Sequence, residues 1–558
     1  MRRRLSLWIV LTLLAITILP HAAGAGTVKA PPTPALQGIS IMGGGTPCGT
    51  PGSWYLGATP PNVDYTKPVL LFVHGMGSCA ETWWGTTSYH GTNDMYTYAY
   101  NNGYRTAFVD LYGDKMMWDN GALLNTLIDK VRSHFGVAKL TVVAHSKGGV
   151  DTNAALAHYG AAGKVSRVVT LGSPHHGTPL ADYAYSTWTW WLAEIFGAQN
   201  DATYSMQTGY MNYFRSVTDG KDPTPYYTLS GYKCGPLFTA IWYSCAFIGG
   251  EDDGVVPVGS TRIPGGTHLK EGYWDHDEIK MGSRTWSYFM PVIRTADVPP
   301  AVAMGGLLAA AGTGPARAAA GTGPARAAAG LGAGNAAAPD SPGNLILRGG
   351  EVTGTAESPA FPLESGVRSA TFTIYASNPD FSATITGPDG KAHAVTMSDQ
   401  VPADQIFGGT WTGHVTVKTP ASGSWALSTA SGARAGYLMI AALDSDLEAT
   451  LDAGQTVAAP GGKRALAAGF RGARTPASSR VEGVVKMSGE QQGENINFTP
   501  ATGGHTANVN VQPARNGIYN ASVTMTGTLP DGTAFERSLA NSFASVAPEQ
   551  RGSWRGQN

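Results

Sequence analysis

Residues 140–149 read Leu-Thr-Val-Val-Ala-His-Ser-Lys-Gly-Gly. The apolar first half is typical of a strand that is buried on both faces, and helix-forming residues continue to about Tyr159. The small residues Ala144 and Gly148 stand two positions either side of Ser146. A sharp turn from strand to helix needs them, because larger side chains would clash. The stretch predicts a strand, a tight turn that exposes the Ser146 hydroxyl, and a helix; the alternative is that Ser146 only caps the helix.

Similar units lie on both sides of this stretch. Residues 69–73, 106–109 and 168–171 are short apolar runs, and residues 122–135 carry apolar side chains at helical spacing. Strands that alternate with helices predict an α/β fold with a mostly parallel sheet and helices on both faces. We expect this α/β unit to end near Ile293.

The composition changes sharply after this unit. Residues 301–338 are nearly all Ala, Gly, Pro and Leu, and the nine residues 312–320 recur at once as 321–329. Such a repeat lacks the large apolar side chains that a core needs, so it predicts a linker. The remainder has short alternating strands and Pro-Asp-Gly turns at 388–390 and 530–532, which predict one or two antiparallel β-sandwich modules.

The N-terminus has the three parts of a secretory signal peptide. Arg2 to Arg4 precede an apolar run from 5 to 19, and the small residues Ala23-Gly24-Ala25 follow. An uncleaved membrane anchor is the alternative, but the run is shorter than the roughly 20 residues that a spanning helix needs. Cleavage after Ala25 would remove three Arg and take the formal net charge from −1 to −4. We expect a secreted, extracellular chain without an integral membrane segment in its mature form.

Composition excludes several classes of protein. The 558 residues are 42% hydrophobic but only 14% charged, with a net charge of −1, so no basic excess indicates a nucleic-acid partner.

Four cysteines allow three pairings, and an exported chain favours disulfides over free thiols. A Cys234–Cys245 bond would close a short loop, and a Cys48–Cys79 bond would tie the N-terminal segment to the first core strand.

Five segments in this order resemble secreted bacterial lipases of the α/β-hydrolase superfamily. They are the Ser146 turn with Ala in the first place of its Gly-x-Ser-x-Gly pattern, a His-Gly motif at 73–77, Pro-His-His-Gly-Thr within 171–182, Asp-Gly-Val-Val-Pro at 253–257 and Asp-His-Asp at 275–279. The resemblance covers roughly residues 50–293. It implies that residues 26–296 are an α/β-hydrolase catalytic domain; the patterns described above predict the rest as a signal peptide (1–25), a linker (297–343), a β-sandwich module (344–450) and a second β-rich module (451–558).

The resemblance implies a role for each candidate residue. Ser146 is the nucleophile, His276 the base that takes its proton, and Asp253 the acid that orients the imidazole, in the chain order of this fold. The backbone N–H groups of Met76 and Lys147 form the oxyanion hole. The Lys147 side chain is expected to be a solvated cation at the start of a helix.

Other residues compete for two of these roles. Asp252 is the alternative acid, Glu251 is expected to cap or pair at the surface, and His268 is the alternative base, although a plain turn precedes it. Structural hydrogen bonds are the expected role of the nearby histidines, His145, His175 and His176.

Residues 183–196 are crowded with aromatic side chains where lipases carry a lid and an acyl pocket, which favours an apolar groove over an ordinary core helix. No cofactor is implied. A structural calcium ion, as in some lipases of this kind, lacks support because no Asp lies about twenty residues before Asp253.

These observations predict an ester hydrolase of the lipase type that acts on apolar esters through an acyl-enzyme. A polyester depolymerase with the same three residues is the alternative, with the C-terminal modules as polymer or cell-surface anchors. A non-catalytic binding protein is the third hypothesis, and the complete Ser146, Asp253 and His276 set argues against it. The expected partner is therefore a lipid or polyester substrate.

Overall fold

The computed structural model describes residues 31–37, 48, 50–189, 199–235, 239, 244–248, 250–295, 343–401, 407–513 and 515–556. The predicted signal peptide, residues 297–342 of the predicted linker, and Trp190, Trp191 and Phe196 lie outside these residues. None of the helices in the described part of the chain combines the length and apolar character that crossing a membrane requires.

The N-terminal half is built on one eight-stranded sheet, in the order β1-β2-β4-β3-β5-β6-β7-β8. The strands from β4 to β8 along this order are parallel to their neighbours, whereas β1 and β2 pair antiparallel at one edge. The strands are β1 (Ala35–Gln37), β2 (Trp54–Leu56), β3 (Leu70–Val73), β4 (Thr106–Val109), β5 (Leu140–His145), β6 (Val165–Leu171), β7 (Tyr226–Gly231) and β8 (Thr267–Gly272).

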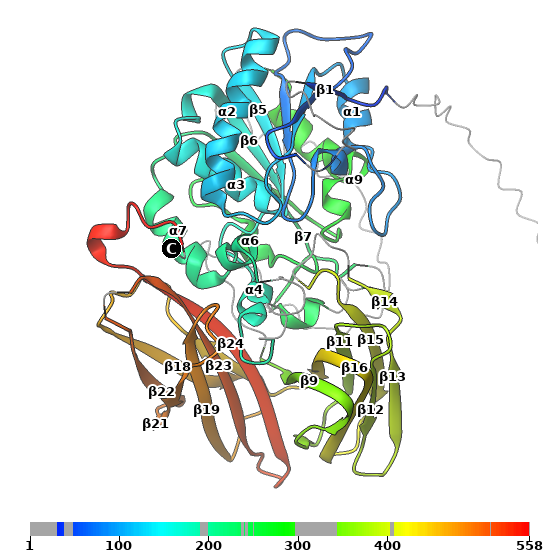
Figure 1. The fold of residues 1–558 in the computed structure, drawn as a ribbon, viewed down its shortest axis with the longest axis vertical. Helices are drawn as coiled ribbons and strands as arrows, with labels where there is room; N and C mark the ends of the chain where they lie inside the picture. The colour runs from blue at the N-terminus through cyan, green and yellow to red at the C-terminus, as the bar shows by residue number, and fades with distance from the viewer. Residues whose placement is uncertain are drawn as a thin grey trace, which may run out of the picture.

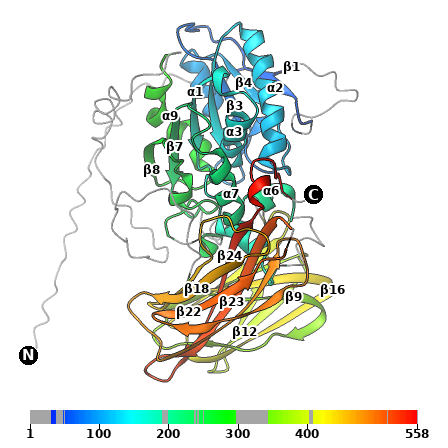
Figure 2. The same ribbon diagram turned by 90° about the vertical axis from the view of Figure 1, so that its left-hand side faces the viewer.

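Helices cover both faces of this sheet, which is why its central strands are continuous apolar runs. Leu71 and Val73 pack with helix α2 on one face, while Leu70 and Phe72 pack with α1 and α9 on the other. Figure 2 shows α1 and α9 on one side of the sheet and α2 on the other. The helices are α1 (Met95–Asn101), α2 (Met117–Phe135), α3 (Lys147–His158), α4 (Pro179–Ala184), α6 (Asp201–Ser205), α7 (Thr208–Thr218) and α9 (Gly282–Phe289).

Short 3₁₀ helices occur in several connections. They are η1 (Ala80–Trp83), η2 (Ala162–Lys164), η3 (Cys245–Phe247), η4 (Val258–Thr261), η5 (Glu278–Lys280), η6 (Met290–Val292) and η7 (Pro548–Gln550).

The C-terminal half consists of antiparallel sheets. The first sheet is centred on β16, which pairs with β9, β10, β11 and β12. Two four-stranded sheets follow, and side chains from both form one core, as in a sandwich. The strands of the first sheet are β9 (Leu345–Glu357), β10 (Phe361–Leu363), β11 (Ser369–Ala376), β12 (Ser382–Thr386), β13 (Ala392–Thr396), β14 (Asp399–Gln400), β15 (Trp411–Lys418) and β16 (Gly423–Asp444). Those of the sandwich are β17 (Glu448–Asp452), β18 (Lys463–Arg471), β19 (Ser478–Met487), β20 (Glu494–Asn497), β21 (Thr499–Ala501), β22 (Gly504–Asn510), β23 (Gly517–Thr528) and β24 (Ala534–Ser545).

The two halves share one apolar cluster, which we call the junction cluster. It joins α4, α6, α7 and η3 of the N-terminal half to β9, β11, β16, β23 and β24 and to Trp554, which follows η7. Figure 1 shows the β-rich half packed beneath α4, α6 and α7, which follow the carboxyl end of the parallel sheet. The predicted fold class, an α/β-hydrolase sheet followed by antiparallel β modules, is confirmed.

Candidate active site

Ser146 stands in a strained turn between β5 and α3. Its φ of 52° lies in the left-handed region that side chains other than Gly seldom adopt, and its hydroxyl makes no capping hydrogen bond to α3. A Cβ atom on Gly148 would lie 2.3 Å from the His74 carbonyl oxygen, and one on Gly75 would lie 2.7 Å from Ser146 Cβ. The glycines therefore let the loop after β3 approach the serine closely.

His276 and Asp253 form a doubly bonded pair. His276 Nδ1 lies 2.8 Å from Asp253 Oδ2, and the His276 main-chain N–H donates to the Asp253 carbonyl oxygen at 2.9 Å. The buried Asp253 also accepts the N–H groups of Val255 (3.0 Å) and Val256 (2.7 Å) at Oδ1. Because the carboxylate holds a proton on Nδ1, the Nε2 atom is the nitrogen that can accept a proton.

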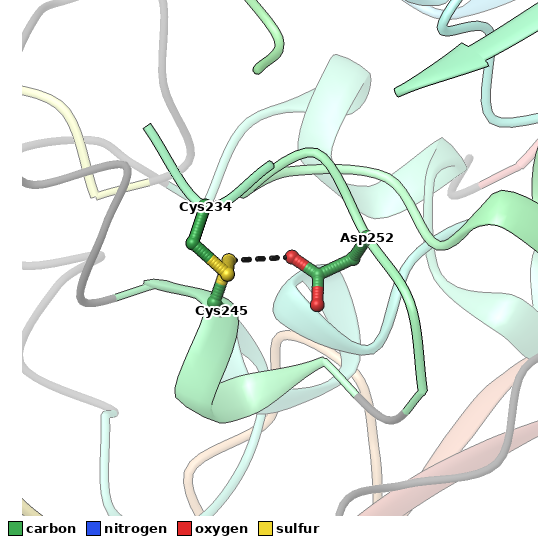
Figure 3. A group of neighbouring side chains, drawn as sticks. All are labelled: Cys234, Cys245 and Asp252. Atoms are coloured by element: carbon green, nitrogen blue, oxygen red, sulfur yellow. Dashed lines mark hydrogen bonds between the residues drawn. A yellow bond between two sulfur atoms is a disulfide. The ribbon is translucent and has the colours of Figure 1, made fainter. Parts of the chain in front are cut away.

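The alternative acid and base lie elsewhere. Asp252 Oδ1 accepts the Gly254 N–H at 2.9 Å and lies 2.7 Å from Cys245 Sγ (Figure 3). His268 is bound on β8 by the Thr228 and Ser230 hydroxyls, at 2.8 and 3.3 Å. The structure therefore places Asp253, and not Asp252, against His276.

The loop after β3 is held by the His74 ring. The His74 Nδ1–H donates to the Gly75 carbonyl oxygen at 2.7 Å, and its Nε2 accepts the Leu111 N–H at 2.9 Å. In a trans peptide the C=O and N–H point in opposite directions, so this bond turns the Met76 N–H away from His74. Burial lowers the pKa of His74 to about 4, which keeps the ring neutral at neutral pH. No role had been predicted for the His74 side chain, although its place directly before Gly75 was a signal.

The second expected oxyanion donor is the N–H of Lys147, the first residue of α3. The first N–H groups of a helix have no partner within the helix, so they are available to an anion. The prediction of a solvated Lys147 side chain is wrong: it is buried and pairs with Asp151 Oδ1 at 2.7 Å. The spacing of four residues between Lys147 and Asp151 was the available signal.

His145 connects the turn of Ser146 to His276. Its Nε2–H donates to the His276 carbonyl oxygen at 2.9 Å, and the two ring centroids lie 4.6 Å apart. Burial, with help from the charges of His276 and Lys280, holds the pKa of His145 well below its ordinary value. The ring is therefore a neutral hydrogen-bonding group, as expected from the sequence.

The expected disulfides are present, and they join Cys48 to Cys79 and Cys234 to Cys245, one of the three pairings that the sequence left open. The second bond lies beside Asp252 (Figure 3), in the loop where the Ser244 hydroxyl donates to the Gly254 carbonyl oxygen. This disulfide therefore anchors η3 next to Asp253.

Neither of two groups of potential metal ligands in the described residues fits a metal ion. In the first group, with Asp252, the Cys234 and Cys245 sulfurs are bonded to each other. The second group comprises His90, Asp275 and Glu278, and the Lys233 ammonium already lies 3.3 Å from Asp275 and 2.6 Å from Glu278.

The aromatic segment after β6 forms part of the junction cluster. Tyr183 and Tyr185 are buried, and Trp188 packs against the same cluster from its edge. Met76 and Val255 also contact this cluster. The aromatic side chains that were expected to line an apolar groove are therefore packed, in the described residues, into the junction between the two halves.

Comparisons with known proteins agree with the fold described above. Residues 69–200 match the family described as PGAP1-like alpha/beta domain. The crystal structure of the Bacillus licheniformis lipase BlEst2 in propeptide form is 30% identical, covers 90% of this chain and 99% of its own, and gives a TM-score of 0.66. The mature form of that lipase is 43% identical over 44% of this chain and 99% of its own, with a TM-score of 0.41. The chain thus has a lipase/esterase-like hydrolase fold and belongs to the family of the Bacillus licheniformis lipase BlEst2, within the α/β-hydrolase superfamily.

Proposed function

We propose that the chain is a secreted serine carboxylic ester hydrolase that acts on apolar esters through an acyl-enzyme intermediate. The observation that carries this proposal is the bond between Asp253 and His276 Nδ1, with the His276 carbonyl held by His145, the residue directly before the serine in the strained turn. Two disulfides support an oxidising, extracellular location.

In the proposed mechanism His276 Nε2 takes the proton of Ser146 as its hydroxyl attacks the ester carbonyl carbon. The Met76 and Lys147 N–H groups stabilise the oxyanion, and Asp253 stabilises the imidazolium. His276 then gives the proton to the leaving alcohol, and a water molecule that His276 activates releases the acid. The steps use only residues of this chain and water.

Adjacent aspartates offer a matched test of this mechanism. Asp253→Asn keeps the shape of the acid but favours the wrong imidazole tautomer, so kcat on a p-nitrophenyl ester should fall by about 10³–10⁴-fold. Asp252→Asn should retain most of the activity, because Asp252 contacts the disulfide side of the loop. Ser146→Ala should lose activity and labelling by a serine-reactive phosphonate. Full activity of Ser146→Ala, or equal activity of the two aspartate variants, would contradict the proposal.

We further propose that residues 343–556 are a removable propeptide that covers the active-site face. The relative described as the propeptide form aligns over 90% of this chain, and the candidate catalytic residues all lie in the N-terminal half. The oxyanion residue Met76 packs against the junction cluster, to which the β-rich half contributes Phe407 and Trp554.

Limited trypsin digestion tests this proposal, because Arg317 and Arg326 lie in the repeats between the halves. Ester hydrolysis should rise at least tenfold once the β-rich half is cut and separated, and an unchanged rate would contradict the covering role. The polyester-depolymerase hypothesis stays a prediction, since the described residues offer no observation in its favour.

A further inference from the structure

The side chain of Asp275 shapes the turn that carries His276. This carboxylate is fully buried, and its Oδ1 accepts the N–H groups of Asp277 at 3.1 Å and Glu278 at 2.9 Å. Such bonds from a side chain to the residues two and three positions ahead fix a turn. The residues on both sides of His276 therefore belong to one hydrogen-bonded loop, with His276 at its apex.

The other oxygen of Asp275 is held by two distant segments. Asp275 Oδ2 lies 2.8 Å from His90 Nε2 and 3.3 Å from Lys233 Nζ. His90 belongs to residues 84–93, the loop that follows η1 and the Met76 segment, and the Ser88 N–H of this loop also donates to Asp277 at 3.1 Å. The segment that follows the Met76 loop thus binds, through His90 and Ser88, the loop that carries His276.

The charges around Asp275 identify its protonation state. Burial alone raises the pKa of this carboxyl, but the His90 and Glu278 hydrogen bonds, together with the charges of His90 and Lys233, hold the pKa below its ordinary value. A carboxylate only accepts hydrogen bonds, so His90 Nε2 carries the hydrogen that joins the two side chains.

We propose that His90 is a positioning residue for the base, acting through Asp275 on the turn that presents His276 to Ser146. This inference rests on the proposed function, because it takes His276 to be the base. Without the His90 bond, Lys233 is the one remaining partner of the buried Asp275 Oδ2 among the residues that the structure describes, and the turn is free to shift. A misplacement of about 1 Å in an active site can cost on the order of 10²-fold in rate.

Two polar substitutions of the same residue give a matched test in the full chain. Glutamine places its Nε2 where histidine has its own, whereas the nitrogen of asparagine stands in the place of Nδ1 and does not reach Asp275. We expect His90→Asn to lower kcat on p-nitrophenyl butyrate, and the rate of labelling by a fluorophosphonate, by about 10–100-fold with KM within about twofold. His90→Gln should stay within about threefold of the wild type in both measurements.

His158→Asn is the control, since it removes a comparable bond from His158 Nε2 to the Thr218 hydroxyl at 2.9 Å, at the far end of α3. It should lower the melting temperature by as much as His90→Asn without lowering kcat. Wild-type rates in His90→Asn, or equal losses in His90→Asn and His90→Gln, would overturn the inference and leave the proposed function intact. A wild type that the fluorophosphonate does not label would overturn the proposed function and this inference with it.

Discussion

Asp182 is an ionisable group sealed inside the contact between the two halves. This carboxyl of α4 is fully buried, and it accepts the Thr208 N–H at 3.1 Å, the Thr208 hydroxyl at 2.6 Å and the Ser542 hydroxyl of β24. Its main-chain carbonyl accepts the Asn520 side chain of β23 at 2.7 Å. The groups that face it are therefore hydroxyls and amides, and the adjacent titratable group is the buried phenol of Tyr183.

Burial raises the pKa of Asp182 to about 7, although the bonds from Ser542 and Thr208 lower it. The pKa in the unfolded chain is 3.8, so the folded value is the higher one. The stability that this group contributes is then complete below pH 3.8 and is lost as the pH rises to about 7. The difference between the two pKa values corresponds to about 4 kcal/mol of unfolding free energy.

Asp182→Asn tests this value, because an amide cannot ionise and its NH₂ can donate to Thr208 as the protonated acid would. Scanning calorimetry of both full chains should show that the unfolding free energy of the wild type falls by about 4 kcal/mol relative to that of the variant between pH 4 and pH 8. Asp201→Asn, at a carboxyl that is 45% exposed, serves as the control for the substitution itself. If the difference in unfolding free energy between the wild type and Asp182→Asn stays constant with pH, Asp182 does not have the raised pKa.

Three further predictions concern the active-site region. His74→Leu removes the bond that orients the Gly75–Met76 peptide, so kcat in steady-state ester hydrolysis should fall about 10²-fold with little change in KM; an unchanged kcat would count against an oxyanion donor there. Gly172→Ala would put a Cβ atom 2.9 Å from Asp253 Oδ2 at a φ of 59°, and should cost about 1–3 kcal/mol of stability in thermal unfolding as well as activity. Burial lowers the pKa of His176 to about 4, so its stabilising contribution, complete above pH 6.5, is lost as the pH falls to about 4. Unfolding followed by circular dichroism should show that His176→Gln loses about 3 kcal/mol less unfolding free energy than the wild type between pH 6.5 and pH 4. Equal losses in the two proteins would contradict this prediction.

The sheet of the N-terminal half could be predicted because its signal is local. Residues 70–73 are apolar without interruption since Leu71 and Phe72 face helices on opposite sides, so this short continuous run indicated a strand buried on both faces. The turn at Ser146 was equally local, because its small neighbours Ala144 and Gly148 are adjacent in sequence.

The parts that escaped prediction depend on contacts between distant residues. The contact between Asp182 and Ser542 spans 360 positions, and the contact between His90 and Asp275 spans 185, so no local pattern records them. Strand β16 is rich in Ala, Gly and Ser, and it was missed because pairing with β9, β11 and β12, rather than strand propensity, holds it extended.

Removal of the β-rich half would expose the N-terminal side of the junction cluster. Without the β-rich half, Tyr213 would lose Trp554, and Phe247 would lose Tyr375 and Phe407. Soluble monomers rarely expose a contiguous patch of aromatic and aliphatic side chains, so we expect the N-terminal half, produced alone, to self-associate or to adhere to apolar surfaces. The C-terminal half would then keep the N-terminal half soluble by covering these side chains. Preparations of the shortened chain should need detergent to stay monomeric.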